Sequence, residues 1–208
     1  MAIPQTQVTL VARLRDPHDA VAWQRLERLY RDLIVRYAMR EGLQAADAED
    51  VAQGVFAALL KSMSTFQYDP ARGRFRDYLF TATRAHISRQ NRFRSRLAAG
   101  QTALSVDALP DTAGSAAPGV VPTDEDQDAR ERFEQEWIDH HYRRAMEELR
   151  RTHPAESVAI FERLLRGEPV EQVAESFATT PAAIYKRRER IRERLKEILD
   201  AQLAEEGD

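Results

Sequence analysis

Carboxylates gather in a short stretch near residue 50. The segment DAED contains Asp47, Glu49 and Asp50, and Gln53 follows one helical turn later. At a helix start such side chains complement the positive end of the macrodipole, and Asp47 could cap the amide of Asp50. A metal site or an acid-base pair needs converging ligands, and no histidine lies nearby in the sequence. From the residues alone, helix capping is therefore the simplest interpretation.

A strongly basic segment follows the carboxylates. Between Arg72 and Arg96 there are eight arginines and one aspartate, a local charge of +7. Aromatic rings are interleaved with these arginines: Phe75, Tyr78, Phe80 and Phe93. This composition suits a surface that holds a phosphate backbone and stacks bases on rings. The alternative is an arginine face that is simply solvated.

A second basic segment lies near the C-terminus. The stretch from Thr180 to Lys196 contains seven basic and two acidic residues, a local charge of +5. Helical spacing turns four apolar residues inward: Ile184, Ile191, Leu195 and Ile198. The candidates for contact with base edges are Thr180, Ala182, Ala183, Tyr185, Lys186 and Arg190, with Arg187, Arg188 and Arg194 placed for phosphates. A charged amphipathic helix on a bundle surface is the alternative.

Helices are predicted to position all three groups. In the first half, apolar periodicity indicates helical structure over 8–40, with a break near Asp16, Pro17 and Asp19 and a stop at Gly42. The helix from Val51 should bury one stripe: Ala52, Val55, Phe56, Leu59, Leu60 and Met63. Its opposite face should carry Asp47, Asp50, Gly54, Ala57 and Lys61. After a turn at Asp69, Pro70 and Gly73, the basic helix should run from about Phe75 to Phe93.

The second half also reads as helices. A capping pattern at Thr123 and Asp126 predicts a helix to about Arg151, followed by helices over 155–166 and 170–177. Thr180 is the predicted N-cap, and Pro181 the predicted first residue, of a final helix. This is helix-turn-helix spacing, although the connector from Phe177 to Thr180 lacks the glycine that is frequent in such turns. No strand is needed anywhere.

Composition bounds the class of protein. The 208 residues contain no cysteine, which excludes disulfides and thiolate metal sites and favours a reducing cytoplasm. No segment is apolar enough for a membrane span, so we expect a soluble, intracellular protein without membrane insertion. The net charge of −3 conceals an acidic stretch, because Asp107 to Glu136 carries a charge of −7. His140, His141 and His153 have no metal-ligand spacing, so we expect no metal and no cofactor.

The expected fold is all-α, with two small helical domains joined by a flexible linker. The N-terminal helical bundle should span 1–96 and the helix-turn-helix domain 125–208. The linker, 97–124, contains prolines and glycines without apolar periodicity.

Together, the DAED-V-xx-VF helix, the FRDYLFTATR helix and the C-terminal helix-turn-helix resemble a sigma factor of the extracytoplasmic-function group in the sigma-70 family. The resemblance covers most of the chain. It implies a non-enzymatic transcription initiation factor that directs bacterial RNA polymerase core to promoter DNA. Docking on the β′ clamp helices would fall to Asp47, Glu49, Asp50 and Gln53. The second domain would also bind the β flap.

The resemblance also assigns the DNA contacts. The −10 element would meet Arg76, Tyr78, Phe80, Arg84, Ser88, Asn91 and Arg92. The −35 element would meet Thr180, Ala182, Ala183, Tyr185, Lys186, Arg187 and Arg190. Tyr78 stands where the family usually has tryptophan.

Two other functions fit parts of the pattern. A stand-alone helix-turn-helix regulator would bind its operator as a symmetric dimer without polymerase. A sigma mimic would keep the fold and sequester an anti-sigma factor, but it would not need the basic segments. An anti-sigma factor, a kinase and control of expression are all open as means of regulation.

Overall fold

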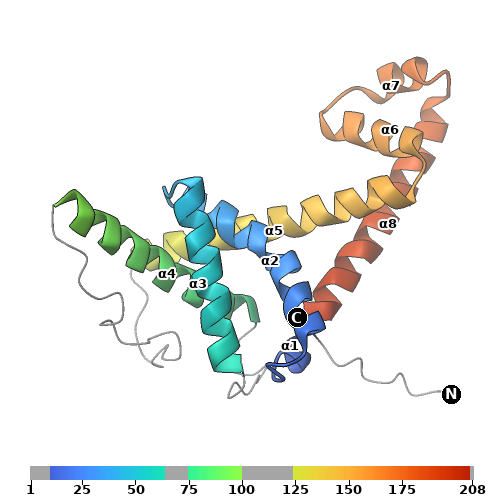
Figure 1. The fold of residues 1–208 in the computed structure, drawn as a ribbon. Coiled ribbons are helices and arrows are strands. Elements are labelled where there is room, and N and C mark those ends of the chain that lie inside the picture. Colours follow the sequence, from blue (N-terminus) through green and yellow to red (C-terminus); the bar gives the residue numbers. More distant parts are fainter. Residues whose placement is uncertain (1–9, 64–74, 100–123, 207–208) are drawn as a thin grey trace. The chain divides into compact units, whose positions relative to one another are not determined.

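The computed structural model describes residues 10–63, 75–99 and 124–206 (Figure 1). These ranges form helices and contain no strand, which confirms the predicted all-α class. The chain divides into two compact units, Met1–Trp137 with Glu205–Asp208, and Ile138–Ala204. Each unit has its own hydrophobic core, and each is described separately below.

The first unit begins with α1 (Leu10–Arg13) and α2 (Ala20–Arg40). Asp19 is the N-cap of α2, because its Oδ1 accepts a hydrogen bond from the amide of Ala22 at 3.0 Å. Arg13 forms an ion pair with the same carboxylate at 2.8 Å, and this pair holds the pKa of Asp19 below its usual value. Gly42, at a φ of 91°, follows the end of α2. The predicted break near Asp19 and the predicted stop at Gly42 are therefore confirmed.

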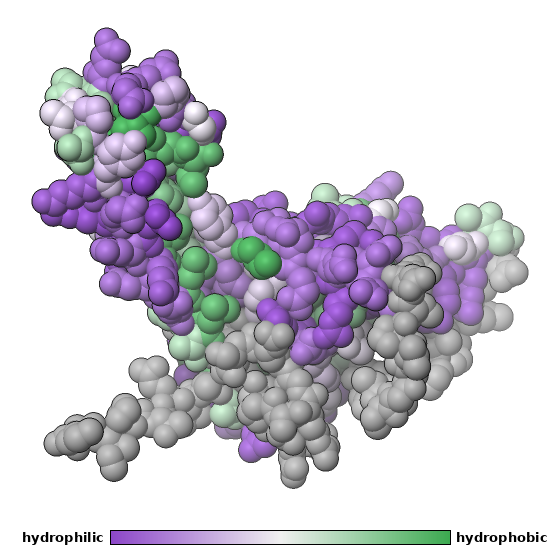
Figure 2. All heavy atoms as spheres, turned by 180° about the vertical axis from the view of Figure 1, so that it is seen from behind, coloured by the Kyte–Doolittle hydropathy of each residue, from purple (hydrophilic) through white to green (hydrophobic). Residues whose placement is uncertain are grey.

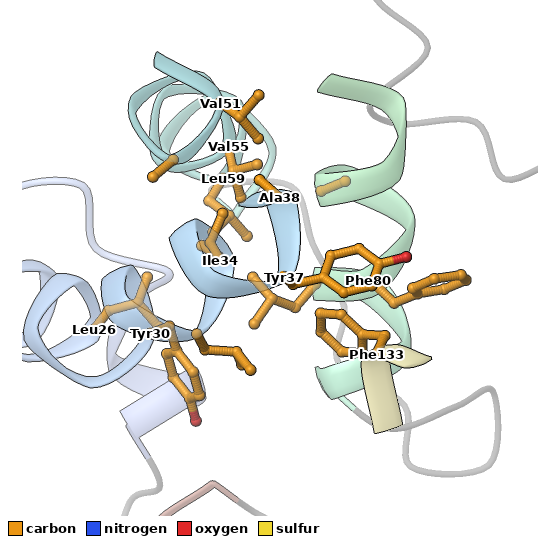
Figure 3. Close-up of a cluster of buried hydrophobic side chains, with 14 of the residues drawn as sticks. Leu26, Tyr30, Ile34, Tyr37, Ala38, Val51, Val55, Leu59, Phe80 and Phe133 are labelled. Atoms are coloured by element: carbon orange, nitrogen blue, oxygen red, sulfur yellow. The ribbon is translucent and has the colours of Figure 1, made fainter. Parts of the chain in front are cut away.

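Helix α3 (Ala45–Met63) packs on α2 and on α4 (Phe75–Ala98). Figure 3 shows Val51, Val55 and Leu59 of α3 beside Ile34 and Ala38 of α2. The predicted stripe is correct at most positions, but Leu60 is wrong: its side chain is 44% exposed, since it lies on the same face as Gln53 and Ala57.

Gly54 is also misplaced by the sequence pattern. We expected it on the open face of α3, whereas it faces His86 of α4. Helix α4 begins at Phe75 as predicted and continues past Phe93 to Ala98, into the predicted linker. The predicted turn at Asp69, Pro70 and Gly73, the cap at Thr123 and the linker residues 100–123 lie outside the described residues.

The long helix α5 (Asp124–Thr152) belongs to both units. Its first half enters the core of the first unit, where Phe133 and Trp137 are almost fully buried. The ring of Phe133 lies 5.1 Å from that of Tyr37 and 5.3 Å from that of Phe80, as Figure 3 illustrates. Trp137 stacks on Tyr30 at 5.6 Å. Such aromatic contacts add to the apolar area that α5 buries here.

Polar contacts hold the same half of α5 in place. The hydroxyl of Tyr37 donates a hydrogen bond to the carbonyl oxygen of Ala129 at 3.1 Å, and burial raises the pKa of Tyr37 to about 12. Arg132 forms an ion pair with Glu41 at 2.6 Å. The predicted boundary at residue 125 therefore differs from the structural one, because the apolar stripe of α5 completes the first core before it reaches the second.

The second unit contains the rest of α5 with α6 (Ala155–Leu165), α7 (Val170–Ser176) and α8 (Pro181–Glu206). One core cluster joins α5, α6 and α8 around Leu149, Phe161 and Ile191, and another lies around Ile160, Val173 and Ile184. The inward positions predicted for α8 are confirmed, since Ile184, Ile191, Leu195 and Ile198 are all buried. Gly167 ends α6 with a φ of 84°.

Helices α7 and α8 form the predicted helix-turn-helix. The amide of Ala183 donates to Oγ1 of Thr180 at 3.3 Å, so Thr180 caps α8 as expected. Ala178 has a φ of 48° in the connector between the helices. The turn therefore keeps the left-handed residue that glycine usually supplies, although an alanine occupies the position here.

Candidate nucleic-acid interface

The carboxylates near residue 50 lie on two different surfaces of α3. Oδ1 of Asp47 accepts a hydrogen bond from Nε2 of Gln90 at 2.8 Å, and its other oxygen lies 3.7 Å from Arg94. Glu49 forms an ion pair with Arg31 of α2 at 2.8 Å, which raises the pKa of that guanidinium. Asp47 and Glu49 therefore connect α3 to its neighbours within the first unit.

The two other residues of this group are open to solvent. Asp50 and Gln53 are exposed, and the same face continues through Ala57 to Leu60. This surface is acidic at one end and apolar at the other. The predicted cap is wrong in detail: α3 starts at Ala45, so Asp47 lies in its first turn, with its carboxylate bonded to Gln90 rather than to the amide of Asp50.

The predicted −10 residues of α4 fall into two groups, of which the first lies against α5. Arg84 forms an ion pair with Asp126 at 2.7 Å, and Arg76 forms one with Glu134 at 3.2 Å. The ring of Phe80 is buried between Tyr37 and Phe133 and does not face solvent.

Other contacts extend the cover of α5 over this face. Asp77 of α4 forms an ion pair with Arg130, and the guanidinium of Arg130 lies 5.8 Å from the ring centroid of Phe80. Tyr78 is half-buried, and its hydroxyl shares a hydrogen bond with Ser62 of α3. Phe80 and Tyr78 therefore have structural contacts that the sequence pattern did not indicate.

The second group occupies the later turns of α4. Ser88, Asn91 and Arg92 are exposed, as is every residue from 91 to 99. Arg92 and Arg96 add positive charge to this surface, where Phe93 is 37% exposed. An exposed, cationic helix face with a partly exposed ring is suited to a nucleic-acid backbone and its bases.

The predicted −35 residues gather at the N-terminal end of α8. The exposed members are Thr180, Ala182, Tyr185, Lys186 and Arg190, while Ala183 is half-buried. Arg187 is also half-buried and forms an ion pair with Glu156 of α6, so it is held against its own unit. The guanidinium of Arg188 lies 5.1 Å from the ring centroid of Tyr185. In a helix-turn-helix, this end of the second helix is the part that enters a major groove.

Comparison with known protein families identifies part of the first unit. The match is to the family described as Sigma-70 region 2, and it covers residues 26–97, from within α2 to the last turn of α4. The chain carries a sigma-70 region 2. The match covers about a third of the chain, and it supports a sigma-factor-like role in promoter recognition and transcription initiation. No curated protein and no solved structure matches the chain.

The sequence pattern did not indicate two features, namely the partners of Arg76 and Arg84 within the first unit and a groove in the second unit. Asp126 and Glu134 meet two of the predicted DNA-binding arginines of region 2, and the only signal was the acidic charge of residues 107–136. In the second unit, a groove of about 400 Å³ is lined partly by Tyr142, Met146 and Leu165. In Figure 2, hydrophobic residues reach the surface of the lobe that contains α6 and α7.

Within the ranges that the structure describes, no three His, Cys, Asp or Glu side chains are grouped closely enough to hold a metal ion. None of the helices in those ranges has both the length and the apolar character to cross a membrane.

Proposed function

We propose that this chain is a sigma factor of the extracytoplasmic-function group, which directs RNA polymerase core to specific promoters and initiates transcription. The observation that carries the proposal is the combination of a sigma-70 region 2 with a second unit built around a helix-turn-helix. A region 2 supplies polymerase and −10 contacts, and a helix-turn-helix supplies major-groove contacts at a second site.

Polymerase docking is assigned to the exposed face of α3. Asp50 and Gln53 can contact basic side chains of the β′ clamp helices directly, because both are exposed. Asp47 and Glu49 support this face, since their carboxylates are paired with Arg94 and Arg31 and keep α3 fixed against α4 and α2. Leu60 extends the same surface with an apolar contact.

Contact with the −10 element is assigned to α4. Ser88, Asn91 and Arg92 are accessible on its exposed turns, and Arg76 and Arg84 add two charges once their partners on α5 are exchanged for phosphates. Tyr78 and Phe80 are half-buried and buried, so their proposed role is to shape this face. A base that stacks on the partly exposed ring of Phe93 gains about 1–3 kcal/mol, which favours a melted strand.

Contact with the −35 element is assigned to α8. Arg190 and Lys186 are exposed at the groove-facing end, and no ion pair joins either to another residue in the described part of the chain. Thr180, Ala182, Ala183 and Tyr185 surround them, and Arg187 lies at the side. The groove beside Tyr142 and Leu165 is the surface that we assign to the β flap. As a sigma factor the protein would act in the cytoplasm and would leave nucleotide polymerisation to its partner.

The test is in-vitro transcription with bacterial core polymerase on a pool of genomic fragments, with and without this protein. We expect the protein to bind core and to create new, specific transcript starts. Specific binding of a palindromic operator by a free dimer, with no change in transcript starts, would instead identify a stand-alone regulator. Capture of an anti-sigma factor without any recruitment by core would identify a sigma mimic.

A further inference from the structure

The acidic first half of α5 lies along the DNA-binding arginines of α4. Arg84 meets Asp126 at 2.7 Å and Arg76 meets Glu134 at 3.2 Å. The two arginines are eight residues apart, and so are the two carboxylates, in the opposite order. The helices are therefore antiparallel here, and each pair is separated from the next by about 12 Å, the rise of eight helical residues.

The pairing occupies the charges that a phosphate backbone would need. The side chains of Arg76 and Arg84 are 17% and 32% exposed, so little of either is available while α5 is in place. A carboxylate and a phosphate oxygen make the same kind of charge-assisted hydrogen bond with a guanidinium. Asp126 and Glu134 are thus direct competitors of DNA for these two groups.

The contact also has an apolar component. Ala129 and Phe133 are buried in the core of the first unit, between the two ion pairs along α5. Arg130, from the same turn, pairs with Asp77 and lies over the ring of Phe80. Access of DNA to the Arg76–Arg84 face therefore requires the first half of α5 to move away as a segment, rather than two side chains to rotate.

We propose that the first half of α5, Asp124–Trp137, is an internal competitor that keeps Arg76 and Arg84 from DNA until it is displaced. The inference rests on the proposed function, because it takes α4 to be the helix that binds promoter DNA. While this segment is in place, nucleic acid can reach the later turns of α4 but not the Arg76–Arg84 face of that helix. Displacement of the segment adds the two covered arginines to the contact surface.

The first experiment measures binding of a fluorescent single-stranded oligonucleotide to the full-length free protein. The test variant is Asp126→Asn with Glu134→Gln. The matched control is Asp128→Asn with Glu131→Gln, which removes the same charge from exposed positions of the same helix. We expect the test variant to bind about tenfold more tightly than the control, because neutral side chains compete poorly with phosphates. Equal affinities in the two variants would overturn the proposal.

A third variant locates the effect. In a background of Arg76→Ala with Arg84→Ala, the gain in oligonucleotide affinity from Asp126→Asn and Glu134→Gln should vanish, because the two arginines that the change would release are absent. A gain that persists in this background would show a general charge effect and would also overturn the proposal. Far-UV circular dichroism checks that every variant keeps its helical content.

The second experiment observes the segment itself. The chain has two tryptophans, so Trp23→Phe leaves Trp137 as the only one. Trp137 is buried against Tyr30, and displacement should shift its emission to longer wavelength and increase quenching by acrylamide when the oligonucleotide binds. Binding without any change at Trp137 would overturn the displacement.

The proposed function is tested separately. Promoter-directed initiation with core polymerase, combined with equal oligonucleotide affinities in the test and control variants, would overturn the competitor proposal and support the proposed sigma-factor function. Absence of initiation with core would remove the proposed function, whatever the oligonucleotide affinities are.

Discussion

Gly54 of α3 lies directly against the imidazole of His86 of α4. A Cβ at position 54 would meet Cδ2 of His86 at 2.5 Å and Nε2 at 3.0 Å. The ring is half-buried, and its Nδ1 lies 2.9 Å from the carbonyl oxygen of Ala82, which limits how far it can turn. Helices α3 and α4 can pack this closely because residue 54 has no side chain.

Gly54→Ala should therefore destabilise the first unit. Overpacking a well-packed site costs about 1–3 kcal/mol, and the better helix propensity of alanine offsets about 1 kcal/mol of this. We expect a net fall in the free energy of unfolding, measured in urea. In a His86→Ala background the sign should reverse, because the clash is gone and the propensity gain remains. Stabilisation by Gly54→Ala with His86 intact would contradict the contact.

The packing of Gly54 against His86 could not be predicted from the sequence. Helical spacing placed Gly54 opposite the apolar stripe, because periodicity reports polarity and glycine has little of it. The break near Asp19, the stop at Gly42 and the inward face of α8 followed from local patterns that act within one turn. Local patterns do not show which helix each apolar stripe packs against. Phe133 and Trp137 are visibly apolar in the sequence, but nothing local indicates which of two cores they enter.

Ala178→Gly should stabilise the helix-turn-helix. Ala178 holds a φ of 48°, a conformation that is less favourable for alanine than for glycine by about 1 kcal/mol. The free energy of unfolding should rise by about that amount. Ala201→Gly, at an exposed position inside α8, should instead lower it by about 1 kcal/mol. Equal effects at the two sites would indicate that residue 178 is not strained.

Asp50→Arg should abolish binding to core polymerase. The change reverses a charge at the acidic end of the exposed α3 surface and removes no ion pair that the structure records, so circular dichroism should be unchanged. Asp200→Arg, an exposed carboxylate on α8, is the control and should bind core normally. Pull-down of core at wild-type levels by the Asp50 variant would remove the docking assignment.

Arg190→Ala should relax promoter choice at the −35 element. A bidentate contact between arginine and guanine supplies about 1–3 kcal/mol of discrimination, so the preference for cognate over altered sites should fall by a factor of about 5 to 150. Arg192→Ala is the comparison, because Arg192 is paired with Glu189 on the exposed side of α8. It should leave the order of preferred sites intact. The readout is transcription from a set of single-base promoter variants.

Alkaline pH should loosen the contact between α2 and α5. Burial raises the pKa of Tyr37 from 10.0 to about 12, so the folded state favours the neutral hydroxyl. Its contribution to stability is complete below pH 10 and is lost as pH rises from about 10 to about 12. Tyr37→Phe should lower stability by about 1 kcal/mol at pH 8, through loss of the hydrogen bond to Ala129.

The difference between the two proteins should then shrink at pH 11, because the phenylalanine variant has no group to ionise at this position. Urea unfolding of both proteins at the two pH values is the measurement. A constant difference would show that Tyr37 does not titrate with folding.

The division of the chain inside α5 has a consequence for how such proteins can be recombined. A fusion point at residue 124, where the helix starts, would take Phe133 and Trp137 away from the first module. Their removal would leave a cavity beside Tyr37 in its core. The second module would gain about four extra turns of helix, and the exposed rings of Phe133 and Trp137 would have no core to pack into. A chimera that joins this first module to another DNA-reading module should therefore be spliced after Trp137, in the middle of a continuous helix and in phase with its periodicity.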